Sequence, residues 1–449
     1  MYTINLFTNP SEAIFRGIFY LFLRLHSNSK EWDDTMHSKR QIFEDITQIM
    51  KKDYAGFLDK KHINCPENYL ITNDMTDKDF VETIKSYLLD FKDGHLSFKA
   101  KKTVIRNRGF KVRRYQNALY VTEVTYETRL QIGDEILEMD GLTIEKFESL
   151  YSKILEDPVP ERQYWNVGLR QTKRVLVNRN DDKFILPLAT YERSPYEPSY
   201  VFKKLDNKTM YLKITDFSQA EPILNLLNNH KNDLDHSHNL IIDVRVNYGG
   251  NDLFYFPILN YVFDREIIFR SLFHEDELMY TNYTDRNCLL WIKELKEYLT
   301  QELDDEMQKW IQEEITTFET NYAKGLMVVP EELDYTIQGQ INPKNVYVLT
   351  DVTCGSSGDT FVQNVKKSAK VTVVGRPTMG IMDFFNVVTV DYDDYEFVYS
   401  ISKMHEKYHY NDSGVKPHIY IPWTPQHLQE DIDLNYVLRL CHQNQEKSL

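Results

Sequence analysis

A strand, a tight turn, a helix and a second strand follow one another within residues 345–380, and this order constrains the fold more than any other stretch. The apolar run 346–349 has the length and β-branched content of a buried strand. Small residues at 353–358 then allow a sharp bend, and apolar residues recur at helical spacing over 361–365. A second apolar run, 371–374, completes an alternation of strand and helix that predicts an α/β fold.

Ser356 lies in this turn, three residues before Asp359. That spacing is typical of a helix N-cap followed by an acid in the first turn. A serine at a helix start also faces free backbone N–H groups, which suits a nucleophile whose attack creates an oxyanion. The segment alone leaves both interpretations open, and capping is the simpler one. Cys354 is interpreted as a small buried filler, with its thiol as a second candidate nucleophile.

Three further motifs accompany this turn. An apolar strand over 239–244 runs into the pair Gly249–Gly250, His95 follows a short turn within 92–98, and residues 130–141 resemble the signature hairpin of a PDZ domain. Taken together and in this order, the motifs resemble the C-terminal processing (tail-specific) serine peptidase family, within it the branch that includes the tricorn core. The resemblance covers roughly residues 85–425.

The resemblance implies a fold and a set of roles. It implies a helical N-terminal region, a PDZ-like β-rich domain and an α/β catalytic core of the ββα (crotonase-like) type. It makes Ser356 the nucleophile and His95 its general base, a task that suits histidine because imidazole accepts protons near neutral pH. The oxyanion would be held by the Ser357 N–H together with that of Gly249 or Gly250, since a side chain at a glycine would block the substrate carbonyl.

Two positions depart from the family pattern. Relatives with a Ser/Lys dyad carry a lysine after their Gly-x-Pro-Thr-x-Gly run, where this chain has Ile381, which leaves His95 as the base. The tricorn branch supplies a glutamate shortly before its Gly-Val-x-Pro run, and the matching position here is Asn411. We expect the neighbouring Asp412 to orient the base in its place.

The composition and net charge limit which classes of molecule the protein can bind. The chain has 449 residues, of which 42% are hydrophobic and 27% charged, an ordinary globular composition for two or three domains. Its formal net charge of −15 disfavours nucleic acid and anionic lipid as partners. The four cysteines lie far apart, which indicates neither a disulfide framework nor a thiolate zinc site.

The domain organisation follows from shifts in the apolar pattern. We expect a helical region over 1–103 that carries the candidate base, the PDZ-like domain over 104–190 and the core over 195–449, with a helical insertion at about 264–342. The insertion is interpreted as a structural elaboration, with a lid or a homo-oligomer contact as alternatives. The apolar stretch 13–25 is too short to span a bilayer and lacks signal-peptide features, so we expect a cytoplasmic protein.

The PDZ-like domain offers a candidate peptide-binding loop. PDZ domains take the C-terminus of a peptide as an added strand and bind its carboxylate with loop N–H groups. Gly109 and Phe110 are the candidates for that loop, although a PDZ-like fold that only positions other parts explains the sequence equally well.

A rival motif lies near the C-terminus. His405, Glu406 and His409 match the HExxH pattern of zinc proteases, which requires a helix to bring both imidazoles to one metal ion. Here the motif follows a strand-like run at 396–402, and Asn411 to Gly414 would break any helix immediately after it. We therefore expect no bound metal and no cofactor.

The sequence as a whole predicts a serine endopeptidase that hydrolyses peptide bonds of unfolded proteins or peptides through a Ser-His acyl-enzyme mechanism. The alternative from another class is an inactive peptide- or ligand-binding relative with the same fold. A zinc metalloprotease is the third interpretation.

Overall fold

The structure is a computed structural model that describes residues 38–102, 106–192, 194–275, 277–301, 303, 305–329, 335–405, 407, 410 and 413–446. Its central element is a six-stranded sheet in the order β10-β11-β12-β18-β20-β23, in which all neighbours are parallel except β10 and β11. The strands are β10 Tyr200–Lys204, β11 Thr209–Ile214, β12 Asn239–Asp243, β18 Asn345–Thr350, β20 Val371–Gly375 and β23 Ile419–Tyr420.

Both faces of this sheet are covered by helices. Side chains alternate along a strand, so Leu240 and Ile242 of β12 enter the large core while Ile241 packs on the opposite face with Val437 of α12. Because side chains on both faces of the sheet are buried, the sequence of each central strand is a continuous apolar run. The covering helices are α6 Ala220–Asn229, α7 Lys231–Asp235, α8 Phe256–Val262, α11 Ser357–Val365 and α12 Ile432–Glu446.

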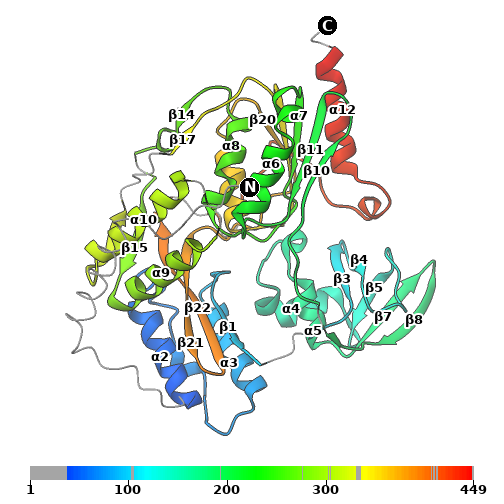
Figure 1. Cartoon of the computed structure of the whole chain (residues 1–449). Coiled ribbons are helices and arrows are strands. Elements are labelled where there is room, and N and C mark those ends of the chain that lie inside the picture. Colours follow the sequence, from blue (N-terminus) through cyan, green and yellow to red (C-terminus); the bar gives the residue numbers. More distant parts are fainter. Residues whose placement is uncertain are drawn as a thin grey trace. The chain divides into compact units, whose positions relative to one another are not determined.

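A second sheet joins three distant parts of the sequence (Figure 1). Ser97 of β1 pairs with Val398 of β22, so the segment that follows His95 is a strand of the same sheet as the C-terminal hairpin. The strands are β1 Ser97–Ala100, β15 Met279–Tyr283, β16 Gly325–Val329, β21 Phe384–Tyr392 and β22 Tyr395–Met404. The helices of this part are α2 Lys39–Lys52, α3 Asp77–Leu89, α9 Asp285–Tyr298 and α10 Asp305–Thr320.

A module with its own core follows β1 in the chain. Trp165 is buried among apolar side chains that belong to the sheet β3-β4-β5-β7-β8 and the helices packed on it. Its elements are β3 Phe110–Tyr115, β4 Ala118–Val124, β5 Glu135–Met139, β6 Leu142–Thr143, α4 Ile144–Leu155, α5 Trp165–Gln171, β7 Arg174–Arg179 and β8 Asp182–Pro187. We call residues 106–192 the β module.

Three pairs of short strands complete the described part of the chain. They are β2 Arg106–Asn107 with β9 Tyr191–Glu192, β13 Val246–Asn247 with β19 Thr353–Cys354, and β14 Ile267–Ile268 with β17 Thr336–Ile337. The parallel pair β13 and β19 matters most here, because it joins the segment before Gly249 to the segment before Ser356.

The mixed α/β class predicted from the sequence is confirmed. The helical insertion expected at about 264–342 contains two helices, because the chain turns after Leu299 and α10 packs against α9. Both helices place apolar residues in one core, so their combined pattern resembles a single long helix. The apolar stretch 13–25 lies outside the described residues. Within them, no helix combines the length and apolar character needed to cross a membrane.

A buried ion network links the β module, the central sheet and α12. The Arg376 guanidinium, only 2% exposed, lies 2.7 Å from Asp351 Oδ2 and 2.7 Å from Asp433 Oδ1. Arg113 of β3 binds both oxygens of Asp351, at 2.7 and 2.8 Å, and Arg245 lies 3.3 Å from Asp433. Burial alone would raise the pKa of Asp351, but the two guanidinium groups hold it well below its ordinary value.

Replacing Arg376 with methionine tests this network. R376M keeps the volume but leaves two buried carboxylates short of a partner, and we expect it to lower the free energy of unfolding by about 3–5 kcal/mol. Urea unfolding followed by circular dichroism measures the change. The matched control is K204M, which removes the exposed Lys204–Asp233 pair and should change stability by less than about 1 kcal/mol. Equal effects of both variants would contradict a dominant role for the network.

Candidate active site

Ser356 occupies the turn between β19 and α11. Its backbone has φ 57° and ψ −124°, a left-handed conformation that is unfavourable for a residue with a side chain. The Ser356 N–H donates to Asp359 Oδ2 at 2.8 Å, so the predicted acid in the first turn of the helix binds the residue at its N-cap. A serine in such a strained turn before a helix is held with its hydroxyl away from the helix interior.

His95 reaches Ser356 from the other sheet. Its Nε2 lies 3.1 Å from Ser356 Oγ, although the two residues are 261 positions apart. The pairing of β1 with β22 fixes the segment that follows His95, and α3 fixes the segment that precedes it. A nucleophile and a base within hydrogen-bond distance of each other form the core of a catalytic pair.

Asp93 is a member of this site that the sequence analysis missed. Its carboxylate is 2% exposed and accepts the backbone N–H of His95 on Oδ1 at 2.9 Å. The same oxygen lies 3.6 Å from Nδ1 of the His95 imidazole. Its other oxygen accepts a hydrogen bond from Ser400 Oγ of β22 at 3.3 Å. Burial and this carboxylate raise the pKa of the neighbouring Tyr54 well above its ordinary value. The sequence did contain one signal for this residue, because Asp93 is a carboxylate only two positions before His95.

The expected third residue cannot be placed in the same way. Asp412 and Asn411 lie outside the described residues, and so do Glu406 and His409 of the candidate zinc motif. His405 is described and follows the last residue of β22, where its N–H donates to the Leu278 carbonyl at 2.9 Å. The first histidine of that motif therefore stands at a strand end rather than on a helix.

The two candidate oxyanion glycines differ in their hydrogen bonds. The Gly249 N–H donates to Asn247 Oδ1 at 3.0 Å and is occupied. Within the described part of the chain, the Gly250 N–H donates no hydrogen bond, while the Gly250 carbonyl accepts Ser357 Oγ at 2.9 Å. The Ser357 N–H belongs to the first turn of α11, whose amides have no acceptor inside the helix. The N–H groups of Gly250 and Ser357 thus remain the candidate oxyanion donors.

Gly249 instead sets the packing of the nucleophile. Its φ is +76°, and a Cβ on this residue would lie 2.6 Å from Ser356 Cβ and 3.0 Å from the Gly355 carbonyl oxygen. Any side chain would therefore displace the serine.

Ile381 fills the space beside the pair. A Cβ on Gly94 would lie 2.6 Å from Ile381 Cγ2, and one on Gly355 would lie 3.2 Å from Ile381 Cδ1. The isoleucine thus packs against the residues that precede His95 and Ser356. Cys354 is fully buried next to this turn, where burial first and nearby carboxylates second raise the pKa of its thiol well above its ordinary value. A buried, protonated thiol agrees with a packing role.

The candidate peptide-binding loop is occupied by contacts within the β module. The Gly109 carbonyl accepts the N–H groups of Thr125, Tyr126 and Glu127, at 2.8 to 3.1 Å, and the Gly109 N–H donates to Asn107 Oδ1 at 2.9 Å. Phe110 is buried in the core of the module.

The outer edge of β3 is also occupied. Asn166 of α5 accepts the Val112 N–H at 3.0 Å and donates to the Val112 carbonyl at 3.4 Å. A peptide strand that added to β3 would need these same two groups.

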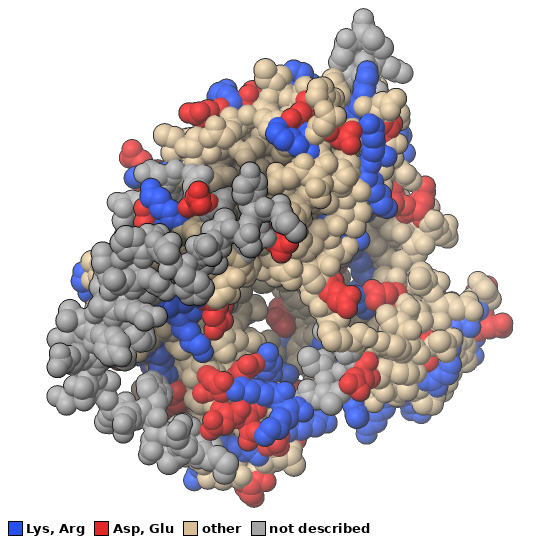
Figure 2. Space-filling model, viewed as in Figure 1, with Lys and Arg blue, Asp and Glu red and all other residues tan. Residues whose placement is uncertain are grey.

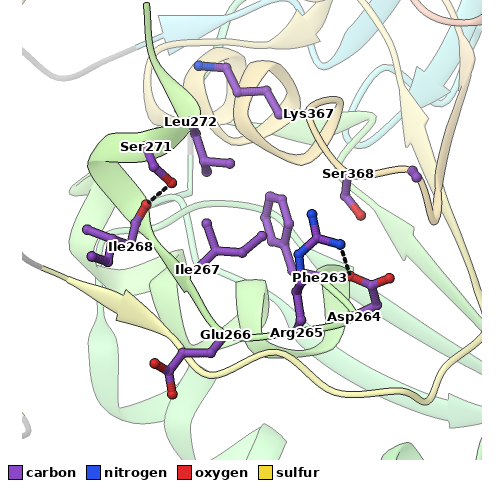
Figure 3. Close-up of a pocket in the computed structure, with 11 residues that line it drawn as sticks. Phe263, Asp264, Arg265, Glu266, Ile267, Ile268, Ser271, Leu272, Lys367 and Ser368 are labelled. Atoms are coloured by element: carbon purple, nitrogen blue, oxygen red, sulfur yellow. Dashed lines mark hydrogen bonds and ion pairs between the residues drawn. The ribbon is translucent and has the colours of Figure 1, made fainter.

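A pocket of about 550 Å³ opens elsewhere, lined by residues 263–268, Ser271, Leu272 and 367–369 (Figure 3). Lys367 and Ser368 follow the C-terminal end of α11, whereas Ser356 lies at its N-terminal end. A helix of this length separates the two by about 13 Å, so the pocket is distinct from the serine site. On the face that Figure 2 shows, acidic and basic side chains are interspersed.

Residues 208–421 match the family model of peptidase family S41. This segment of the chain is similar to the S41 peptidase domain. The likeness indicates a serine-type peptidase, a hydrolase. The matched segment contains Ser356 and both glycines, while His95 and the β module precede it. A search of curated proteins gave no sequence match.

Solved structures with a similar fold extend the likeness beyond the S41 domain. Mature CPAF complexed with lactacystin superposes with a TM-score of 0.62 at 14% identity, over 90% of this chain and 97% of that chain. Mature CPAF alone gives a TM-score of 0.61 at 14% identity, over 87% of this chain and 94% of that chain. At such low identity the likeness concerns the fold, and it includes the regions on both sides of the S41 domain.

Gly249→Ala tests the packing at Ser356. The added methyl group must displace Ser356, so we expect the rate of covalent labelling by a fluorophosphonate to fall about 100-fold, the loss typical of a displacement of 1 Å. The control is G141A, because Gly141 also has a positive φ, +82°, but a Cβ there meets nothing within 4 Å. Both variants carry the same backbone strain. Equal labelling of G249A and G141A would show that the close contact does not position the serine.

Proposed function

We propose that this protein is a serine endopeptidase that cleaves unfolded proteins or peptides through a Ser-His acyl-enzyme mechanism. The observation that carries the proposal is the 3.1 Å separation of His95 Nε2 and Ser356 Oγ, with the buried Asp93 carboxylate on the other side of the imidazole. A nucleophile, a base and an orienting acid in this order are what acyl transfer to a serine requires.

The first step is attack on the scissile carbonyl. Neutral His95 accepts the hydroxyl proton of Ser356 at Nε2, and Oγ forms a bond to the carbonyl carbon. The negative charge then moves to the carbonyl oxygen, where the N–H groups of Gly250 and Ser357 can stabilise it. Gly250 is preferred to Gly249 because the Gly249 N–H is already bound to Asn247.

Asp93 fits the role of the orienting acid. A neutral imidazole that accepts a proton at Nε2 must carry its hydrogen on Nδ1, and Asp93 Oδ1 is the carboxylate oxygen on that side. When His95 becomes an imidazolium ion, the same buried charge stabilises it. The distance of 3.6 Å is longer than a hydrogen bond, and a shift of less than 1 Å would close it. Asp412, which is next to the position that matches the family's glutamate, is the alternative.

The remaining steps use the same groups in reverse. The imidazolium ion of His95 donates its proton to the leaving amine, and the C–N bond breaks to leave an acyl ester on Ser356. Water then enters, His95 takes one of its protons, and the ester is hydrolysed to release the second product and regenerate the hydroxyl.

The departures from the family pattern fit this mechanism. Ile381 stands where the lysine of a Ser/Lys dyad would be, and its packing against Gly94 and Gly355 leaves the histidine as the base. The β module is PDZ-like in its predicted hairpin, and we propose that it acts as a scaffold, since its loop and the β3 edge are occupied by Asn107 and Asn166.

The close approach of His95 and Ser356 also argues against the inactive relative. A binding protein has no need for a strained serine that contacts a half-buried histidine next to a buried acid, because strain of this kind persists only where the surroundings hold it in place. The zinc interpretation needs a helix at His405, and that residue follows a strand.

The first prediction concerns the catalytic pair. Ser356→Ala and His95→Ala should each lower the turnover of an unfolded reporter protein by at least about 10⁴-fold, because each removes the same covalent pathway. The double variant should be hardly slower than either single one. Release of fluorescent peptides measures turnover, and phosphonate labelling followed by mass spectrometry identifies the serine. Cys354→Ala is the control and should retain nearly full activity. A dead Cys354→Ala with an active Ser356→Ala would move the nucleophile to the thiol.

The second prediction separates the two candidate acids. Asp93→Asn should lower kcat about 10³-fold at unchanged KM, because asparagine can offer an N–H to Nδ1 and so favour the wrong tautomer. Asp412→Asn should lower it less than about 10-fold. The control is Ser400→Ala, which removes only the hydrogen bond to Asp93 Oδ2 and should have a small effect. The reverse order of the two aspartate variants would return the orienting role to Asp412.

A further inference from the structure

The Asp359 side chain is a buried carboxylate that the reaction described above does not use. It is fully buried in the first turn of α11. Its Oδ2 accepts the N–H groups of Ser356 at 2.8 Å and Ile381 at 3.0 Å, and its Oδ1 accepts the Gly380 N–H at 2.8 Å. A helix cap would need only the first of these bonds. The other two bind a loop that is more than 20 residues away in the sequence.

These bonds join the two halves of the site. Through the Ser356 N–H, Asp359 stabilises the left-handed backbone conformation of Ser356. Without this bond the strained backbone could relax to a more favourable conformation. Through Ile381 N–H, it fixes the residue whose side chain packs on Gly94, immediately before His95. The Asp359 carboxylate therefore fixes the position of Ser356 and the position of Ile381, which packs beside His95.

We propose that ionised Asp359 is a positioning residue of the peptidase, which aligns Ser356 with His95 by holding the nucleophile turn and the Gly380–Ile381 loop together. The proposal rests on the proposed function of Ser356 and His95. Asp359 touches neither substrate nor the reacting atoms, so it acts on the alignment of the pair and not on the chemistry itself.

The surroundings of Asp359 make its charge conditional on pH. Burial raises its pKa to about 6, although the Thr378 side chain and the three backbone N–H groups oppose that shift. Three charged or titratable groups face Asp359: His95 beside Ser356, the thiol of Cys354 and the phenol of Tyr164. The charge of Asp359 contributes to the raised pKa of Cys354 and to that of Tyr164. The Arg162 guanidinium binds the Thr378 and Met379 carbonyls of the same loop.

Protonation would break this arrangement. Both oxygens of Asp359 accept hydrogen bonds from N–H groups, so a proton on either oxygen faces a donor and must displace it. The turn and the loop would then separate, and the activity would fall for a reason independent of the protonation of His95.

Protonation of Asp359 changes the stability of the folded state in the opposite direction from the activity. Because the pKa of Asp359 is about 6 in the folded chain and about 4 when unfolded, the folded state binds the extra proton between these values. The contribution of this group to stability therefore increases as pH falls from 6 to 4. Loss of activity in that window is not loss of the fold through Asp359.

The test compares Asp359→Asn with the wild type. Asparagine keeps the shape but has one acceptor oxygen for three N–H donors, so we expect kcat at pH 7.5 and the rate of fluorophosphonate labelling to fall about 100-fold, with KM within about 3-fold. Below pH 6 the slope of log(kcat/KM) against pH should be larger by about one in the wild type than in D359N, because only the wild type carries the Asp359 carboxyl group.

The matched control is Asp252→Asn. Asp252 also contacts α11, where it accepts Thr360 Oγ1 at 2.9 Å, and burial raises its pKa as well. It binds neither the Ser356 N–H nor the loop, so D252N should keep kcat within about 3-fold and the wild-type slope. Thermal unfolding of both variants at pH 5.5 and 7.5 shows whether each is folded.

The outcomes separate this inference from the proposed function. A D359N variant with kcat within 3-fold of the wild type, or with an unchanged slope, overturns the positioning role even when Ser356 is labelled. If D359N does not fold, the pH profile of the wild type is the deciding measurement, and a profile that does not steepen as the pH falls below 6 overturns the proposal. Absence of labelling at Ser356 in the wild type would instead contradict the proposed function itself.

Discussion

The buried pairing of Arg376 with Asp351 and Asp433 is the interaction on which the arrangement of this protein depends. Asp351 follows β18 and Arg376 follows β20, the strands that precede the nucleophile turn and the Gly380–Ile381 loop. The pairing therefore fixes the ends of two neighbouring strands, and Asp433 adds α12. A buried pair adds little net stability compared with apolar packing, but its directional geometry excludes other arrangements of the same parts, which we regard as its role here.

Close backbone packing is the second constraint. His95 lies in the turn before β1, a strand of the sheet that contains β22, whereas Ser356 follows β18 of the central sheet and the short strand β19. The pair therefore forms only where these two parts of the chain meet. Glycines make this approach feasible, since Gly94 and Gly249 leave no room for a side chain beside Ile381 and Ser356. A site assembled in this way is precise because both sheets are rigid, and it is sensitive to any change in their separation.

The β module contributes in a different manner. Arg113 joins it to Asp351, and Arg162 binds the carbonyls of Thr378 and Met379 next to the loop held by Asp359. The module thus contacts the core at two places: at Asp351, just before the turn that contains Ser356, and at the residues just before the Gly380–Ile381 loop. Its own strand edge is covered by Asn166, which agrees with a part that supports the core.

The sequence by itself determined the elements whose signals are local. The strand, turn and helix around Ser356, the glycine pair, and a histidine after a turn all follow from spacing and residue type, and the family resemblance that they carry made Ser356 and His95 the candidate pair. Only the tertiary structure decided how hydrogen bonds are shared among these elements. Gly250 is distinguished from Gly249 by the Asn247 side chain, and Asp93 gains its role because β1 pairs with β22 and buries it. A sequence pattern records which groups can donate or accept, whereas the folded chain determines which of them are already occupied.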